Sequence, residues 1–245
     1  MGSLPGSPRS SRLATLKSVP NGRRGLAAGL LVVASVLSIA TVEVRVWKTG
    51  DPYYRFLIWN LVLAWVPLVL ASAAYSSAVR SRRKLVVPLS IAWILFFPNA
   101  PYVLTDFIHL NGEHAAAPVW YDALMISSCA WTALLIGLAS LYLMQMVAQR
   151  ALGTAWSWAG VVAALALASF GVYLGRFVRF NSWDALIRPR RVANVITHQL
   201  ENPFQHPRML AVLVLLTASL TVAYAILYVF AGLQLDLPKN VSRQE

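Results

Sequence analysis

Three segments of the chain combine acids, imidazoles, amides and arginines in patterns that could do chemistry. In the first, Asp106 and His109 are three residues apart, so on a helix they would share one face. An acid and an imidazole on one face can relay a proton or bind a divalent metal, which makes both residues candidates for catalysis. The alternative is a polar loop at the water interface. A metal would need two further ligands from Asp122, Glu113 or His114, and no strict pattern fixes them, so metal and cofactor stay unassigned.

The second segment places Asn99 and Tyr102 around two prolines, Pro98 and Pro101. The apolar run before them, residues 85–97, rises only about 20 Å as a helix, so the first proline arrives while the chain is still within the membrane. Proline lacks an N–H and disfavours helical dihedrals in the residue before it. We therefore expect the helix to break, with Asn99 and Tyr102 available to a ligand. The alternative is a proline kink packed against neighbouring helices.

The third segment contains Arg176 and Arg179, followed by Asn181 and Asp184. Two arginines one turn apart would share a helix face, and guanidinium groups make forked contacts with phosphate or carboxylate. At the edge of the hydrocarbon they either turn inward to a partner or extend outward to lipid head groups. The inward arrangement predicts a ligand site with Asp106, Asp122 and Asp184 as candidate internal counterions.

The composition shows what must position these residues. Of 245 residues, 58% are hydrophobic and 12% are charged, about half the charged fraction of a soluble domain. A soluble globule is excluded, and backbone in lipid must be helical to satisfy its own hydrogen bonds. We predict an all-α membrane protein: a bundle of six transmembrane helices with a proline-broken third helix and an interfacial amphipathic helix between helices five and six. The expected spans are residues 26–46, 54–77, 85–105, 119–147, 155–180 and 209–232.

The chain divides into one membrane domain and two short tails. Residues 1–24 predict a disordered basic cytoplasmic tail, 25–235 the six-helix domain, and 236–245 a short cytoplasmic tail. Residues 189–202 carry apolar residues at spacings of three and four, which predicts an amphipathic helix in the outer interface. This helix would be either a lid over the ligand site or a surface float.

The first span resembles both a signal peptide and a membrane anchor. Arg23 and Arg24 precede it, and Ser38-Ile39-Ala40 has the small-x-small form of a cleavage site. The apolar stretch nevertheless continues through Trp47, which favours an uncleaved anchor.

Basic residues predict the orientation. With six spans, one set of ends and loops holds 12 Lys and Arg and the other holds 9, so both termini are predicted to be cytoplasmic. The basic residues lie between apolar spans, which favours lipid over nucleic acid as the partner. The single cysteine, Cys129, offers neither an intrachain disulfide nor a cysteine-based zinc cluster.

The polar segments resemble the signature segments of the DUF1361 family, which are the runs 54–61, 97–110 and 175–184. The likeness covers about residues 45–232, and the long tail before the first span looks like an addition. The resemblance implies a bacterial multi-pass membrane protein and no particular reaction, and we expect the bacterial plasma membrane as its location.

These residues predict a pocket on the outer face that binds an anionic ligand, such as a lipid or polyprenyl phosphate. The alternatives are a small-solute or proton-coupled transporter and an assembly subunit without chemistry. Whether the protein is an enzyme, and its oligomeric state, are left open.

Overall fold

The computed structural model describes residues 21–110, 116–180, 187–201 and 205–233, and this part of the chain is helical without strands. Six helices are long and apolar enough to cross a membrane, as predicted. The helices are α1 (Asn21–Thr49), α2 (Phe56–Val79), α3 (Arg83–Phe96), α4 (Asn99–Tyr102), α5 (Val119–Leu152), α6 (Thr154–Tyr173), α8 (Pro189–Glu201) and α9 (Pro207–Leu233). Two 3₁₀ turns, η1 (Tyr53–Arg55) and η2 (Val103–His109), and a π-helical turn, η3 (Leu174–Val178), complete the described elements.

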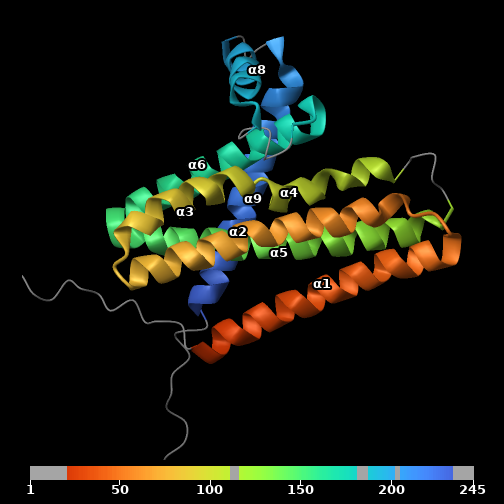
Figure 1. The fold of residues 1–245 in the computed structure, drawn as a ribbon, viewed down its shortest axis with the longest axis horizontal. Helices are drawn as coiled ribbons and strands as arrows, with labels where there is room; N and C mark the ends of the chain where they lie inside the picture. Colours follow the sequence, from red (N-terminus) through yellow and green to blue (C-terminus); the bar gives the residue numbers. More distant parts are fainter. Residues whose placement is uncertain (1–20, 111–115, 181–186, 202–204, 234–245) are drawn as a thin grey trace, which may run out of the picture.

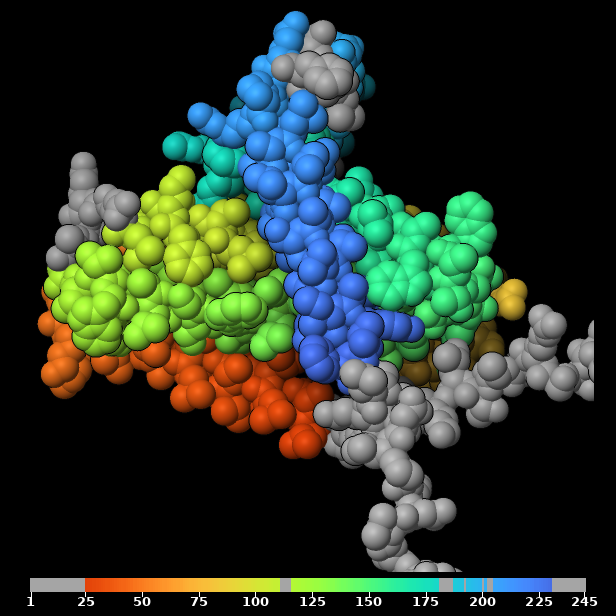
Figure 2. All heavy atoms as spheres, turned by 180° about the vertical axis from the view of Figure 1, so that it is seen from behind, coloured from red at the N-terminus to blue at the C-terminus, as the bar shows by residue number. Residues whose placement is uncertain are grey.

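Helix α5 is the centre of the bundle. It packs against α1, α2, α4, α6 and η2, and about two thirds of its apolar stretch is buried within the protein. Helix α9 packs mainly on α6 and crosses the other helices steeply (Figure 1). Seen from behind, α9 lies across the outside of the bundle (Figure 2). The core therefore sits between α2, α3, α5 and α6, and α1 and α9 cover it from outside.

Helix α1 is tied to α5 by hydroxyl groups. Ser38 is fully buried, and its Oγ lies 2.8 Å from Ser128 Oγ and 3.1 Å from Thr132 Oγ1. Interhelical hydrogen bonds of this kind hold membrane helices together in the absence of a hydrophobic driving force. Ser38, the first residue of the segment that resembles a cleavage site, is thus part of a packed helix interface. Helix α1 begins at Asn21, within the predicted tail, and the rest of that tail lies outside the described residues.

The third span corrects one expectation. Helix α3 ends just before Pro98, but Phe97 keeps helical dihedrals (φ −56°, ψ −37°), and so does Pro98 (φ −56°, ψ −24°). The predicted departure of Phe97 from helical dihedrals is therefore wrong. Local hydrogen bonds explain this, because the Ala100 N–H donates to the Phe97 carbonyl at 3.2 Å and Asn99 Nδ2 donates to the Phe96 carbonyl at 2.8 Å. The span tightens into 3₁₀ geometry and does not unwind.

Two glycines allow the proline segment to enter the core. A Cβ atom on Gly171 of α6 would lie 2.6 Å from Pro98 Cγ, and one on Gly137 of α5 would lie 2.7 Å from Ala100 Cβ. Both distances are shorter than side-chain carbons tolerate. The absence of these Cβ atoms therefore sets how deeply α4 lies between α5 and α6.

Helix α8 begins at the predicted proline. It stands apart from the bundle beside the start of α9 (Figure 1). Ile196 packs against the buried cluster formed by Tyr173, Leu174 and Met209, and the Tyr173 hydroxyl donates to Gln199 Oε1 at 3.4 Å. The amphipathic helix is thus attached to the end of α6, and its place in a membrane interface stays a prediction.

Candidate functional site

A buried ion pair joins the third and fifth spans. Asp106 of η2 is fully buried and pairs with Arg176 of η3, whose side chain is 11% exposed. Asn60 Nδ2 of α2 donates to the second carboxylate oxygen at 3.0 Å, and Arg176 Nε donates to Thr105 Oγ1 at 2.8 Å. Asp106 is one of the three carboxylates that the sequence offers as a counterion. The pair brings together two predicted site residues that are 70 positions apart.

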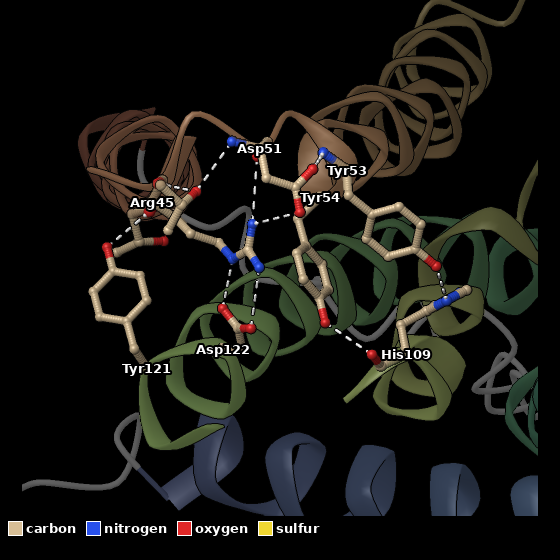
Figure 3. A network of polar contacts seen from close by, with 9 residues as sticks. Arg45, Asp51, Tyr53, Tyr54, His109, Tyr121 and Asp122 are labelled. Carbon is tan, nitrogen blue, oxygen red and sulfur yellow. Dashed lines mark hydrogen bonds and ion pairs between the residues drawn. The ribbon is translucent and has the colours of Figure 1, made fainter. Parts of the chain in front are cut away.

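His109 lies between Arg176 and a tyrosine. Its Nε2 is 3.1 Å from Arg176 Nη1, and its Nδ1 is 2.9 Å from the Tyr53 hydroxyl. A guanidinium can only donate, so Nε2 must accept and the single ring proton must sit on Nδ1, from which it is donated to Tyr53. The Tyr54 hydroxyl fixes the same residue by donating to the His109 carbonyl at 2.8 Å (Figure 3). The geometry requires a neutral His109 in one tautomer.

The π-helical turn aims Arg176 inward. It inserts one residue into the helical repeat, and Gly175 lets the ring of Tyr102 approach, since a Cβ there would lie 3.1 Å from Tyr102 Cε2. The Arg176 guanidinium lies over that ring, 4.3 Å from its centre. Tyr102, predicted to line the site, therefore contacts it through its ring.

Arg179 does not join this arrangement. It closes the π turn in the left-handed conformation (φ 64°), and its side chain is exposed. The expectation that both arginines share one face and turn inward together is wrong, because the extra residue of the turn and the left-handed closure separate their directions.

A second buried pair replaces another expectation. Asp122 of α5 was a candidate counterion for the arginines of the fifth span, but it receives two hydrogen bonds from Arg45 of α1, Nε to Oδ1 at 2.7 Å and Nη2 to Oδ2 at 3.3 Å. Both side chains are buried, and Asp51 Oδ2 lies 3.7 Å from Arg45 Nη1. This forked pair is shown in Figure 3.

Tyr54 connects the two pairs. The Arg45 guanidinium lies over the Tyr54 ring, 4.4 Å from its centre, and the Tyr54 hydroxyl donates to the His109 carbonyl (Figure 3). The two arginine–carboxylate pairs thus belong to one polar network at a single end of the bundle. Sequence reasoning missed six members of it: Arg45, Asp51, Tyr53, Tyr54, Asn60 and Thr105. The available signals were an arginine and an amide inside apolar runs, which are costly in lipid unless they have partners.

The remaining predicted residues lie elsewhere. Asn99 is on α4, where it supports the Phe96 carbonyl. Asn181 and Asp184 fall outside the described residues. Within the described ranges, no group of three or more His, Cys, Asp and Glu side chains is placed to hold a metal ion. Chemically, the network can hold charge, orient a guanidinium and exchange a proton at His109.

No curated protein and no solved structure matches this chain. The family model described as "Protein of unknown function (DUF1361)" matches residues 59–223, a range that includes Asn60, Asp106 and Arg176, whereas Arg45, Tyr53 and Tyr54 precede it. Because this match covers more than half of its length, the chain belongs to the DUF1361 family of proteins of unknown function.

Proposed function

We propose that this multi-pass membrane protein binds an anionic, lipid-like ligand with a phosphate or carboxylate group at Arg176. One observation carries the proposal. Arg176 is held by its neighbours, yet among the described residues only three of its five N–H groups have acceptors, on Thr105, His109 and Asp106. A guanidinium that is already oriented and keeps N–H groups to donate is suited to an incoming oxyanion.

Positive charge surrounds this position. The Arg208 guanidinium lies 5.6 Å from the ring centre of Phe177, the residue that follows Arg176 in the chain. The Arg191 guanidinium lies 5.9 Å from the ring centre of Phe180. An excess of one charge raises the local concentration of ions of the opposite sign. The exposed arginines of this end are Arg179, Arg188, Arg190, Arg191 and Arg208, against Glu201 as the exposed acid within described residues 174–210.

Apolar side chains flank the site. Phe107 is 39% exposed, Ile108 64% and Phe177 41%, and all three are next to or close to members of the network. In a bilayer these side chains would contact acyl chains. A ligand with an apolar tail could therefore approach Arg176 from the leaflet, which favours a lipid-like molecule.

The proposal includes a location. With 12 basic residues on one side and 9 on the other, both termini are cytoplasmic and the polar end faces outward from a bacterial plasma membrane. Helix α8 then lies in the outer interface.

Native mass spectrometry of the gently purified full-length protein tests the proposal. Wild type should retain an anionic lipid that Arg176→Gln loses and Arg179→Ala holds more weakly. Arg150→Ala is the matched control, because Arg150 stacks on Tyr75 at the opposite end of α5 and should not affect retention. Identical, unselective lipid in all four proteins would contradict the proposal.

Proton-coupled transport is a second candidate, favoured by the position of His109 between a guanidinium and a phenol. Buried ionisable groups with hydrogen-bonded neighbours are typical of proton pathways. A proteoliposome flux that disappears in Asp106→Asn would favour transport, and turnover without flux would favour an enzyme.

An assembly role without chemistry is favoured by a different observation, namely that each buried carboxylate has its own arginine. The exchange of charges in Asp106→Arg with Arg176→Asp tests it. Full restoration of stability and growth by the double variant would support the assembly role and weaken the ligand site.

A further inference from the structure

We propose that anion binding at Arg176 takes up a proton at His109 Nε2, so that ligand and proton bind together. The inference rests on the proposed function, since it concerns regulation of the same site. It starts from the contact between Arg176 Nη1 and His109 Nε2, 3.1 Å apart. The two nitrogens cannot both point a proton at each other, because a hydrogen bond between them needs one nitrogen to act as the acceptor.

The surroundings of His109 determine what a proton at Nε2 does. Its charged neighbours are Arg176 of η3 and Asp106 of its own turn. The other groups that face it are neutral: the hydroxyl of Tyr53 on Nδ1, the hydroxyl of Tyr54 on its carbonyl, and the ring of Phe56 at 4.9 Å. Nδ1 already donates to Tyr53, so Nε2 is the ring nitrogen that can accept a proton.

Proton uptake therefore acts on Arg176. A proton from water bonds to Nε2, the hydrogen bond from Nη1 is lost, and the imidazolium repels the guanidinium. The contacts of Arg176 with Asp106 and Thr105 are made by Nη2 and Nε, so the side chain can stay attached while Nη1 turns away. Nη1 then has both of its N–H groups for an anion. A monovalent anion and one proton together leave the net charge of the site unchanged.

Linkage gives the expected pH dependence. If one proton is taken up with the ligand, affinity rises as the pH falls through the titration of His109, by up to about tenfold per pH unit. Below that titration the histidine is already protonated, so affinity levels off.

The experiment uses the full-length protein in nanodiscs of neutral phosphatidylcholine. Dihexanoyl phosphatidylglycerol, whose phosphodiester keeps its charge between about pH 5.5 and pH 8, is the lipid probe, and sulfate is the free-oxyanion probe. Binding is measured by calorimetry at several pH values. We expect tighter binding at low pH in wild type. If phosphatidylglycerol binds and sulfate does not, the natural ligand is a lipid headgroup. If sulfate binds equally well, the natural ligand is a free oxyanion.

His109→Gln is the decisive variant, because its amide oxygen can accept from Arg176 but does not titrate. It should bind the probe with little pH dependence. His198→Gln is the matched control, since His198 is exposed on α8, and it should keep the wild-type pH dependence. A pH dependence that survives unchanged in His109→Gln would overturn the inference.

A second readout needs no ligand. Nitrogen NMR of isotopically labelled histidine, assigned with single His→Gln variants of the four histidines, reports the tautomer of each ring. We expect His109 to be neutral with its proton on Nδ1 at high pH and doubly protonated at low pH. Absence of probe binding at every pH would refute the proposed function, whereas an Nε2–H tautomer at high pH would refute the proton coupling by itself.

Discussion

Arg45 and Asp122 form a pair with both side chains out of solvent, which sets the consequence of removing either. In Asp122→Ala the buried guanidinium would lose its forked carboxylate and keep only Asp51 at 3.7 Å, and breaking a buried pair in this way costs about 3–5 kcal/mol. We expect a correspondingly large loss of stability, measured as resistance to unfolding by denaturing detergent.

The pair between Glu43 and Arg55 provides the control. Its side chains are 44% and 55% exposed, although the Arg55 Nη2 to Glu43 Oε2 distance is only 2.8 Å. Solvent screens such a pair, so Glu43→Ala should leave the unfolding curve close to wild type. Equal losses in Glu43→Ala and Asp122→Ala would mean that burial does not determine the energetics of these pairs.

Individual pairings were only partly predictable. Asp106 and Arg176 both lie near the C-terminal ends of the third and fifth spans, and one intervening span returns the chain so that these two ends lie on the same side, so their meeting could be expected. The partner of Asp122 could not be identified, because the pattern pointed to the arginines of the fifth span, Arg176 and Arg179, and only helix packing selects Arg45. The tautomer of His109 likewise depends on a donor 67 residues away.

At the scale of elements, the six spans could be predicted because a helix needs about 20 apolar residues to cross a bilayer. The π-helical turn at Leu174–Val178 could not, since one inserted residue leaves no mark in the hydrophobic pattern. The end of α3 at Phe96, before the prolines, could be predicted, but the helical dihedrals of Phe97 could not, because the preference that proline imposes on the preceding residue is overridden here. Local donors, the Asn99 amide and the Ala100 N–H, restore the hydrogen bonding of the Phe96 and Phe97 carbonyls.

The fit of the proline segment into α6 gives a second prediction. Gly171→Ala would bring a methyl group to 2.6 Å from the ring of Pro98, so α4 must shift. Overpacking of this kind costs about 1–3 kcal/mol, and the shift would also move η2, which carries Asp106. We expect lower stability together with weaker retention of the anionic lipid.

Gly160→Ala is the matched control, because it makes the same substitution in α6 at a position that does not contact the proline segment. A Cβ at Gly160 meets nothing within 4 Å, so alanine should be neutral or slightly stabilising through helix propensity. The packing argument would be wrong if Gly160→Ala destabilised the protein as much as Gly171→Ala does.

For the whole molecule, the three spans between Arg82 and His198 predict that these two positions lie on opposite sides of the membrane. In a Cys129→Ala background, a membrane-impermeant maleimide should label His198→Cys on intact cells and Arg82→Cys only after permeabilisation. Both positions are exposed, and His198 lies on α8 whereas Arg82 precedes α3. The reverse pattern would place the arginine-rich end in the cytoplasm and would turn the proposed ligand site to the other leaflet.

The span count and the general arrangement follow from hydropathy, but the position of α9 does not. Every face of α9 is apolar enough for lipid, so its sequence does not select the side that packs on α6. Its steep crossing of the bundle is decided by contacts such as Met209 with Tyr173 and Leu174.

The separation of Arg45 and Asp122 along the chain also constrains biosynthesis. Arg45 is made 77 residues before its partner, which at ribosomal rates of 5–20 residues per second is about 4–15 s. During that interval the Arg45 guanidinium lacks the forked contact with Asp122 and has only the more distant, partly exposed carboxylate of Asp51 nearby, which leaves a cation that is costly in lipid. The first helix must therefore wait beside the insertion machinery, or with Arg45 extended to the surface, until α5 emerges. Premature release of the nascent chain before α5 would leave a fragment that quality-control proteases can recognise by its unpaired charge.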